Sequence, residues 1–256
     1  VWVCMPPIYN SHEVQWLTKN SLSITEWKPV TGSRPPLTLE DWTAEFDRYK
    51  ASPEFKLLNS HMNLAEFKMI YYMEWLHRQW GRFIGLSFVL PAIYFVARRR
   101  VSKPMSLALL GISAGIGFQG FIGWWMVKSG LKDDLFAPGS HPRVSQYRLT
   151  THLGAAFCVY TAMLWSGLSI LRDRAFLSNP TAGLANLTAR AHPHLSIFRK
   201  SIAGLALLVF TTAMSGGLVA GLDAGMIYNE FPMMGKGLTP PKTELFQKFY
   251  SRKEDG

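Results

Sequence analysis

The sequence predicts an all-α integral membrane protein, a bundle with about four transmembrane helices. Nearly half of the 256 residues (48%) are hydrophobic, and these residues gather in long runs instead of being spread evenly along the chain. A helix of about 20 mostly apolar residues is long enough to cross the hydrocarbon core of a bilayer. Four runs reach this length without a charge at their centre, over residues 73–97, 105–127, 147–171 and 201–222.

The placement of charge predicts the orientation of the bundle. The net charge of +10 is of the kind found in nucleic-acid-binding proteins, but no base-reading motif accompanies it. Basic residues gather in the loops after the first and third runs, whereas Asp133 and Asp134 offset the basic residues of the loop after the second run. Because inner-side loops carry an excess of lysine and arginine, the two basic loops are predicted to lie on the inner side of the membrane.

The polar segment before the first run is predicted to lie on the outer side. Thr38 followed by Asp41 predicts the start of an amphipathic helix over residues 42–49. Residues 60–70 are predicted to lead into the first run as an interfacial helix. Since residues 1–8 have no basic front end or cleavage signal, no intact signal or transit peptide is recognised. The start is expected to be processed, truncated or alternatively spliced.

A weak internal repeat predicts a duplicated fold. The stretch EWKPVTGSRPP from Glu26 is loosely matched, in the order of its glycine and prolines, by EFPMMGKGLTPP from Glu230. Each half would then contain a helix, this loop and further helices, and the chain would lack the helix before residue 23 and those after residue 241. Three parts are predicted: an outer-side segment, a transmembrane bundle, and an outer-side loop that opens the second repeat and ends in an unrelated tail, over residues 1–72, 73–222 and 223–256.

Two histidines occupy matching positions in the first and third runs. His77 lies about four residues inside its run and His152 about five, which is roughly 6 and 7.5 Å along a helix. Both runs cross in the same direction, so the two imidazoles are predicted at similar depth near the outer face. Ionisable groups inside a membrane are costly and usually face a site or a partner. The pair is predicted to hold one metal ion, and anchoring of the helix ends at the interface is the alternative.

Small residues follow both histidines at the spacing of one helix face. Gly81 and Gly85 lie below His77, and alanine lies below His152. A flat macrocycle bound edge-on between helices needs such space, and facing helices of a bundle can supply bis-histidine ligation of haem. Zinc is less favoured, because no further ligand of the right type lies near beyond Glu74. Plain helix packing is the alternative for the small residues.

Charged residues surround the predicted haem site. Arg78, Arg82 and Arg148 lie near the histidines, and guanidinium groups suit bidentate pairing with haem propionates. Snorkelling of these side chains to the interface is the alternative. Glu74 precedes His77 by three residues and has three open roles: it orients the imidazole, it transfers a proton or stabilises charge at a substrate, or it pairs with Arg78 one turn on.

Five segments, which cover most of residues 20–240, resemble a known family. They are LSITEWKPVTGSRPP, MEWLHRQWGR, GFQGFIGWWMVKSGL, HPRVSQYRLTTHLG and SGGLVAGLDAGMIYNEFPMMG. Together they are similar to the haem A synthase family of the mitochondrial type. The resemblance implies an eight-helix enzyme of the mitochondrial inner membrane with two similar four-helix halves and basic loops on the matrix side. It also implies oxidation of a ring methyl of haem O to a formyl group, by successive hydroxylations and loss of water, which gives haem A for cytochrome c oxidase assembly.

The resemblance implies roles for particular residues and partners. His77 and His152 match the axial pair of the first half, which binds the substrate haem O, and Glu74 matches the family's functional glutamate and is the catalytic candidate. A haem b cofactor belongs to the second half, whose ligands are absent here. The chain is expected to be a truncated or splice form, with a non-catalytic haem carrier or chaperone of the cytochrome b type as the alternative. Implied partners are the bilayer, a haem O synthase, a ferredoxin-type electron donor and a second copy of the chain; nucleic acid is not expected.

Overall fold

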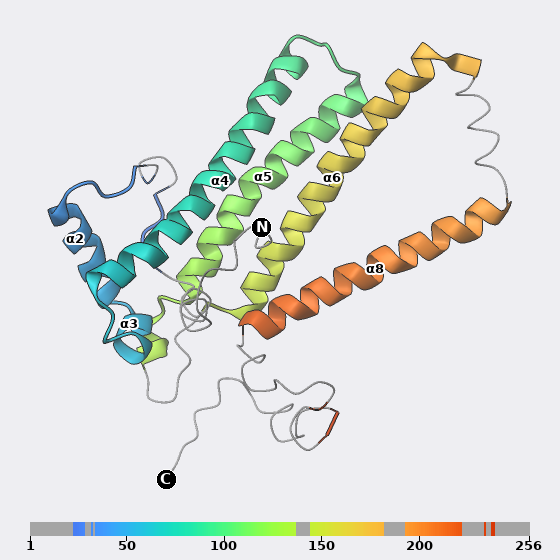
Figure 1. The fold of residues 1–256 in the computed structure, drawn as a ribbon. Coiled ribbons are helices and arrows are strands. Elements are labelled where there is room, and N and C mark those ends of the chain that lie inside the picture. Colours follow the sequence, from blue (N-terminus) through green and yellow to red (C-terminus); the bar gives the residue numbers. More distant parts are fainter. Residues whose placement is uncertain are drawn as a thin grey trace. The chain divides into compact units, whose positions relative to one another are not determined.

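The structure is a computed structural model in which the described residues form helices joined by short segments (Figure 1). Residues 23–28, 32, 34–136, 144–181, 193–221, 233, 237 and 238 are described. The second copy of the predicted repeat, from Glu230, lies almost wholly outside these residues. The helices, including the single-turn 3₁₀ helix η3, are α2 (Leu39–Lys50), α3 (Pro53–Leu58), α4 (Leu64–Ala97), α5 (Lys103–Ser129), η3 (Asp133–Phe136), α6 (Gln146–Ser178) and α8 (Pro193–Gly221).

The chain divides into two compact units, and the division runs through α4 and α5. The first unit holds α2, α3 and η3 with the parts of α4 and α5 up to residue 84 and from residue 124. The second unit holds the remaining parts of α4 and α5, together with α6 and α8. Each unit is therefore described by its own contacts.

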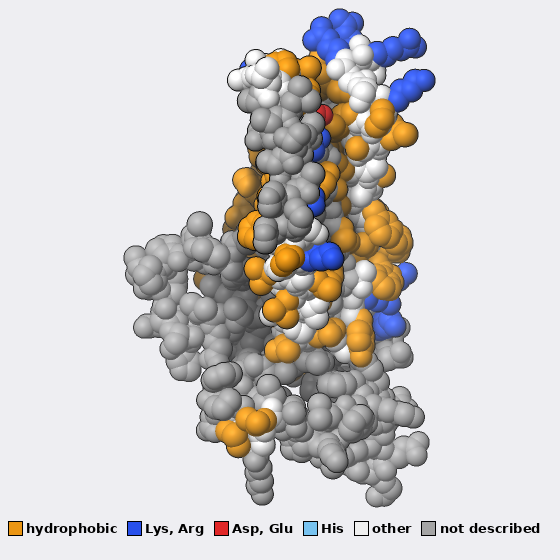
Figure 2. Space-filling model, turned by 90° about the vertical axis from the view of Figure 1, so that its right-hand side faces the viewer, with side chains coloured by type: hydrophobic (Ala, Val, Ile, Leu, Met, Phe, Trp, Pro, Cys, Tyr) orange, Lys and Arg blue, Asp and Glu red, His pale blue; other side chains and the backbone are white. Residues whose placement is uncertain are grey.

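In the described part of the chain, four helices, α4, α5, α6 and α8, are long and apolar enough to cross a membrane. Most of their apolar side chains are exposed, and Figure 2 shows such side chains over the face that it presents, with several lysine and arginine side chains at one end and others lower on the same face. In water this surface would be unfavourable, whereas in a bilayer lipid chains or other helices cover it. The predicted class, an all-α membrane protein with four apolar spans, is confirmed.

The first spanning helix is longer than its apolar run. It begins at Leu64, so that the helix predicted over residues 60–70 and the run from residue 73 form one continuous element. The start has a local cause: Asn63 Oδ1 accepts hydrogen bonds from the amides of Ala65 and Glu66, and Glu66 Oε2 accepts one from the Asn63 amide. A helix of 34 residues is about 51 Å long, which exceeds the roughly 30 Å of a bilayer core.

The amphipathic helix predicted after Thr38 is confirmed as α2. The Asp41 amide donates to Thr38 Oγ1 over 3.1 Å and the Thr38 amide donates to Asp41 Oδ2 over 3.1 Å, which is a complete capping box. These hydrogen bonds from Thr38 lower the pKa of Asp41. The following short helix α3 was not predicted; Ser52 caps it and Pro53 is its first residue, a combination that marks a helix start.

Aromatic side chains join α2 and α3 to the N-terminal part of α4. Phe67 of α4 is fully buried, with ring centroids 5.0 Å from Phe46 and 5.3 Å from Tyr49 of α2. Trp42 makes an edge contact with Tyr71 at 5.1 Å. Such pairs each contribute about 0.5–1.5 kcal/mol beyond the area that they bury. Burial raises the pKa of Tyr49, and this aromatic cluster fixes α2 against α4.

Glycines allow a close approach of α6 and α8 in the second unit, and an edge contact between Phe157 and Phe210, with ring centroids 6.3 Å apart, also joins the two helices. The two helices meet at one end and diverge along their length (Figure 1). At the close end, a Cβ on Gly221 would lie 2.6 Å from Gln146 Cβ, and one on Gly217 would lie 3.1 Å from Thr150 Oγ1. Glycine is therefore needed at Gly221 for this approach. Farther along, α5, α6 and α8 line an open apolar groove of about 730 Å³.

Candidate functional site

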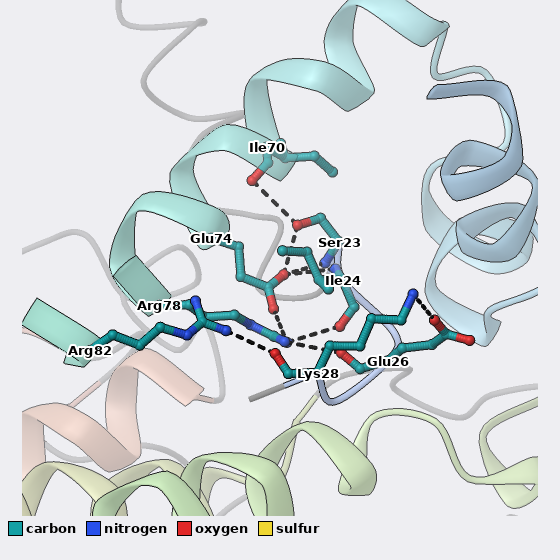
Figure 3. A network of polar contacts seen from close by, with 8 residues as sticks. All are labelled: Ser23, Ile24, Glu26, Lys28, Ile70, Glu74, Arg78 and Arg82. Atoms are coloured by element: carbon teal, nitrogen blue, oxygen red, sulfur yellow. Dashed lines mark hydrogen bonds and ion pairs between the residues drawn. The ribbon is translucent and has the colours of Figure 1, made fainter. Parts of the chain in front are cut away.

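The Glu74 carboxylate is the centre of a polar network between α4 and the N-terminal segment, defined here as residues 23–28 (Figure 3). Glu74 Oε2 accepts hydrogen bonds from the Ser23 amide (2.8 Å), the Ser23 hydroxyl (2.6 Å) and the Ile24 amide (2.9 Å). Glu74 Oε1 pairs with Arg78 Nη2 at 2.7 Å. Both charged side chains are mostly buried, with exposures of 16% for Glu74 and 19% for Arg78. Charge-assisted bonds of this kind are stronger than those between neutral groups.

Two arginines continue the attachment along α4. Arg78 donates from Nη2 to the Ile24 carbonyl over 3.1 Å and from Nη1 to the Glu26 carbonyl over 3.0 Å. Arg82 donates from Nη2 to the Lys28 carbonyl over 2.8 Å. The accepting carbonyls belong to every second residue, and the donors are one helical turn apart. The N-terminal segment therefore runs in the same direction as α4 in one defined register (Figure 3).

Ion pairs attach the same segment to α2. Lys28 Nζ lies 2.5 Å from Glu26 Oε2 and 3.8 Å from Glu45 Oε1 of α2. Arg48 Nη1 lies 2.6 Å from Glu45 Oε1, and Arg48 Nε lies 3.9 Å from Glu26 Oε1. The hydrogen bond from Lys28, together with the charges of Lys28 and Arg48, lowers the pKa of Glu26. A cavity of about 20 Å³ lies beneath the segment, enough for about one water molecule. The segment is thus closely packed over the helices.

Tight contacts continue past residue 28. A Cβ on Gly32 would lie 3.0 Å from Lys28 Cβ and 3.5 Å from Arg82 Nη2, so that glycine leaves room for these two side chains. Trp27 packs against Trp124 of α5 with ring centroids 5.9 Å apart. The segment therefore also reaches the end of α5 within the first unit.

His77 lies on α4 beside the row of residues that binds the segment. Glu74, Arg78 and Arg82 recur every four residues, and His77 and Gly81 form a neighbouring row. At 100° per residue, His77 lies about 60° around the helix from Glu74 and about 100° from Arg78. The His77 side chain is exposed, and a Cβ on Gly81 would meet nothing within 4 Å. The space that the sequence predicts below His77 is therefore present at Gly81.

His152 lies on α6 against α5. Its imidazole faces Gly123, where a Cβ would lie 3.4 Å from His152 Cε1. Gln119 Nε2 donates to the His152 carbonyl oxygen over 3.2 Å, and Arg148 is half-buried one turn before His152. Gly85 likewise faces α5, with 3.4 Å between a built Cβ and Ile116 Cγ2.

The structure brings together Glu74, Arg78 and Arg82, but through partners that the sequence did not predict. The main-chain amides of Ser23 and Ile24 cannot be recognised as donors from the residue types. In this segment the sequence drew attention only to the EWKP stretch, as part of the predicted repeat. The hydrogen bond from Gln119 to the His152 carbonyl was likewise not predicted. His77 belongs to the first unit and His152 to the second, so their pairing stays a prediction.

The residues present fit a haem better than a zinc ion. In the described part of the chain, no three His, Cys, Asp or Glu side chains gather closely enough to hold a metal ion, and structural zinc needs four ligands. Haem needs only axial ligands from the protein, because the porphyrin supplies the others. Gly81 leaves open space beside His77, and Gly123 admits the His152 ring.

The fold and the site define a multi-pass helical membrane protein whose spanning helices carry histidines. A family model described as cytochrome oxidase assembly protein matches residues 16–255. The chain belongs to this family.

Relatives with curated names support the same grouping. Heme A synthase COX15 of Saccharomyces cerevisiae is 52% identical over 240 residues, which cover 93% of this chain and 49% of the yeast protein. The heme A synthase-mitochondrial ferredoxin fusion protein of Schizosaccharomyces pombe is 52% identical over 244 residues, covering 93% and 39%. Heme A synthase COX15 of Homo sapiens is 46% identical over 226 residues, covering 88% and 52%. The chain spans about half the length of these relatives. No solved structure matches it.

Proposed function

We propose that this chain carries the substrate site of a haem A synthase, in which His77 and His152 are the axial ligands of haem O. The reaction oxidises a ring methyl of haem O to a formyl group and gives haem A for cytochrome c oxidase. The observation that carries the proposal is the matched placement of the two histidines in spanning helices of a chain that is 52% identical to a heme A synthase.

Distances along the helices support a shared depth for the two histidines. Arg98 follows His77 by 21 residues, and Arg172 follows His152 by 20. One spanning helix, α5, separates α4 from α6, so α4 and α6 cross the membrane in the same direction. At 1.5 Å per residue, each imidazole is about 30 Å along its helix from the first arginine of the basic end, which is the thickness of a bilayer core.

The chain's own residues bind and orient the substrate. The haem iron supplies redox chemistry, and neutral imidazoles are its usual axial ligands. Gln119 holds the backbone of His152, and Gly123 lets the imidazole lie close to α5. Arg148 lies one helical turn before His152 on α6, and because a guanidinium group suits bidentate pairing with a carboxylate, we assign it to a haem propionate.

The test is the absorption spectrum of the full chain purified in detergent with haem O. We expect a low-spin bis-histidine spectrum that is lost when His77→Ala and His152→Ala are combined. His61→Ala, a change outside the apolar run, is the matched control and should leave the spectrum unchanged. An unchanged spectrum in the double variant would contradict the proposal. A normal spectrum without production of haem A, in cells that lack the native enzyme, would favour the non-catalytic haem carrier.

Electron supply and location follow from the relatives. The Schizosaccharomyces pombe relative is a fusion with mitochondrial ferredoxin, so we propose a ferredoxin-type protein as the electron donor of this chain. We place the chain in the mitochondrial inner membrane with its basic loops on the matrix side, as the excess of lysine and arginine in those loops supports. We expect purified ferredoxin to reduce the bound haem. We also expect the basic loops to be protected from protease in mitoplasts.

A further inference from the structure

We infer that Glu74 is a positioning residue, which holds the N-terminal segment against α4 beside His77 and does not itself exchange protons with the substrate. The inference rests on the proposed haem site and adds a wall to it, namely residues 23–28. Three observations carry it: the occupancy of the carboxylate, the register of the segment and the adjacency of two rows on α4.

Four donors occupy the Glu74 carboxylate, three of them on the same oxygen. A carboxylate offers about four acceptor positions, and Glu74 receives three hydrogen bonds at Oε2 and one from Arg78 at Oε1. A group that transfers protons must lie within hydrogen-bond reach of the reacting atom. Among the described residues, Ser23, Ile24 and Arg78 donate hydrogen bonds to this carboxylate, and the side chain is only 16% exposed.

The attachment continues beyond Glu74 in one direction. Arg78 and Arg82 bind the carbonyls of alternate residues, so that the segment is fixed at both ends and in the middle (Figure 3). Loss of Glu74 would remove the acceptor of two amides and would leave the Ser23 hydroxyl with the Ile70 carbonyl alone. It would also leave the Arg78 guanidinium without its counter-charge. A mostly buried arginine without a counter-charge is unfavourable, so the change would loosen the register that Arg78 sets.

The segment lies where it can shape the haem site. Its binding row on α4 borders the row of His77 and Gly81, since His77 lies about 60° around the helix from Glu74 and about 100° from Arg78. The segment also carries Trp27, which packs on Trp124 at 5.9 Å. A fixed segment at this place borders the edge of a macrocycle on His77 and limits access of water to it. Solvent exposure is one of the factors that set the potential of a haem.

Hydrogen exchange of the full chain in detergent tests the attachment directly. In Glu74→Ala, the backbone amides of Ser23 and Ile24 should exchange at least about tenfold faster, since hydrogen bonds to a charged acceptor are lost. Glu74→Gln keeps an acceptor oxygen for these amides and should restore most of the protection. Glu66→Gln is the matched control, because the Glu66 carboxylate also accepts a hydrogen bond from a main-chain amide, that of Asn63 at the start of α4. Unchanged exchange in Glu74→Ala would overturn the inference.

Haem readouts separate positioning from proton transfer. In Glu74→Ala the low-spin spectrum should remain, while the midpoint potential falls because water reaches the haem edge. The rate of haem O conversion should correlate with the protection of the segment from hydrogen exchange. Both should be lowest in Glu74→Ala and largely restored in Glu74→Gln. A Glu74→Gln protein with a protected segment but no conversion would overturn the inference, because the carboxylate itself would then be required. If the unaltered chain shows no bis-histidine spectrum, the proposed function fails, whereas the exchange series still decides whether Glu74 holds the segment.

Discussion

The two parts of α4 differ in what surrounds them, although both are apolar and helical. In the N-terminal part (residues 64–84), Phe67, Ile70 and Tyr71 are buried by other segments of the same chain. In the C-terminal part (residues 85–97), Leu90 is 60% exposed, and only Ala92 is buried among the described residues there. The first part is positioned by aromatic and charged contacts, whereas the second presents a surface for lipid or further helices. Hydrophobicity therefore does not distinguish a packed site from a membrane-facing one, but aromatic pairs and polar partners do.

The largest difference between the two parts should appear in truncations to alanine. Phe67→Ala removes a fully buried ring from the aromatic cluster and should cost about 3–5 kcal/mol of unfolding free energy in the first unit. Leu90→Ala, at an exposed position of the same helix, should change it by about 0.5 kcal/mol or less. Both changes in unfolding free energy can be measured by denaturant unfolding in micelles, with hydrogen exchange of α2 as the readout. Equal effects would show that the contrast between the parts is wrong.

A glycine substitution extends the comparison to the second unit, where α6 and α8 meet through small residues. Gly221→Ala should cost about 1–3 kcal/mol, because its Cβ would lie 2.6 Å from Gln146 Cβ and one helix must move. Gly204→Ala is the control: a Cβ there meets nothing within 4 Å, and alanine should stabilise the helix by up to about 1 kcal/mol. Thermal unfolding in detergent compares the two. Equal melting temperatures would indicate that α6 and α8 do not depend on this close approach.

An arginine substitution tests whether the attachment of residues 23–28 to α4 depends on the planar guanidinium group of Arg78. Arg78→Lys keeps the charge but loses the fork that binds Glu74 and two carbonyls at once. We expect a loss of about 1–3 kcal/mol in the attachment of residues 23–28, read from their hydrogen exchange. Arg98→Lys, at the far end of α4, should have no effect on this segment. Full retention of protection in Arg78→Lys would reduce the role of Arg78 to that of a simple counter-charge.

The smallest expected effect is a dependence on pH. The folded-state pKa of Glu26 is lowered by its hydrogen bond from Lys28, so its contribution is present above the ordinary value of 4.5 and is lost as the pH falls through the lowered value. Quenching of Trp27 fluorescence should therefore increase at acid pH, with Trp27→Phe as the blank. In Glu26→Gln this transition should be absent. A transition that persists in Glu26→Gln would assign the pH dependence to another carboxylate.

Sequence patterns predicted the helices well and the network around Glu74 poorly. Apolar runs and the Thr38–Asp41 spacing indicate α2 and the four spans, because they reflect local or one-dimensional properties of the chain. The pair of Glu74 with Arg78 was one of three open roles, and it is present because i and i+4 side chains share a helix face. The attachment of Ser23 and Ile24 could not be predicted, since main-chain amides are the donors and about 50 residues separate them from Glu74.

The central claim is that this chain binds haem O through His77 and His152, and identification of the extracted haem tests it most directly. Acid–acetone extraction of the full chain, purified from cells that make haem O, should yield haem O, together with haem A where conversion occurs. The combined His77→Ala and His152→Ala variant should yield neither. Recovery of no haem from the unaltered chain, or of equal haem from the double variant, would contradict the claim.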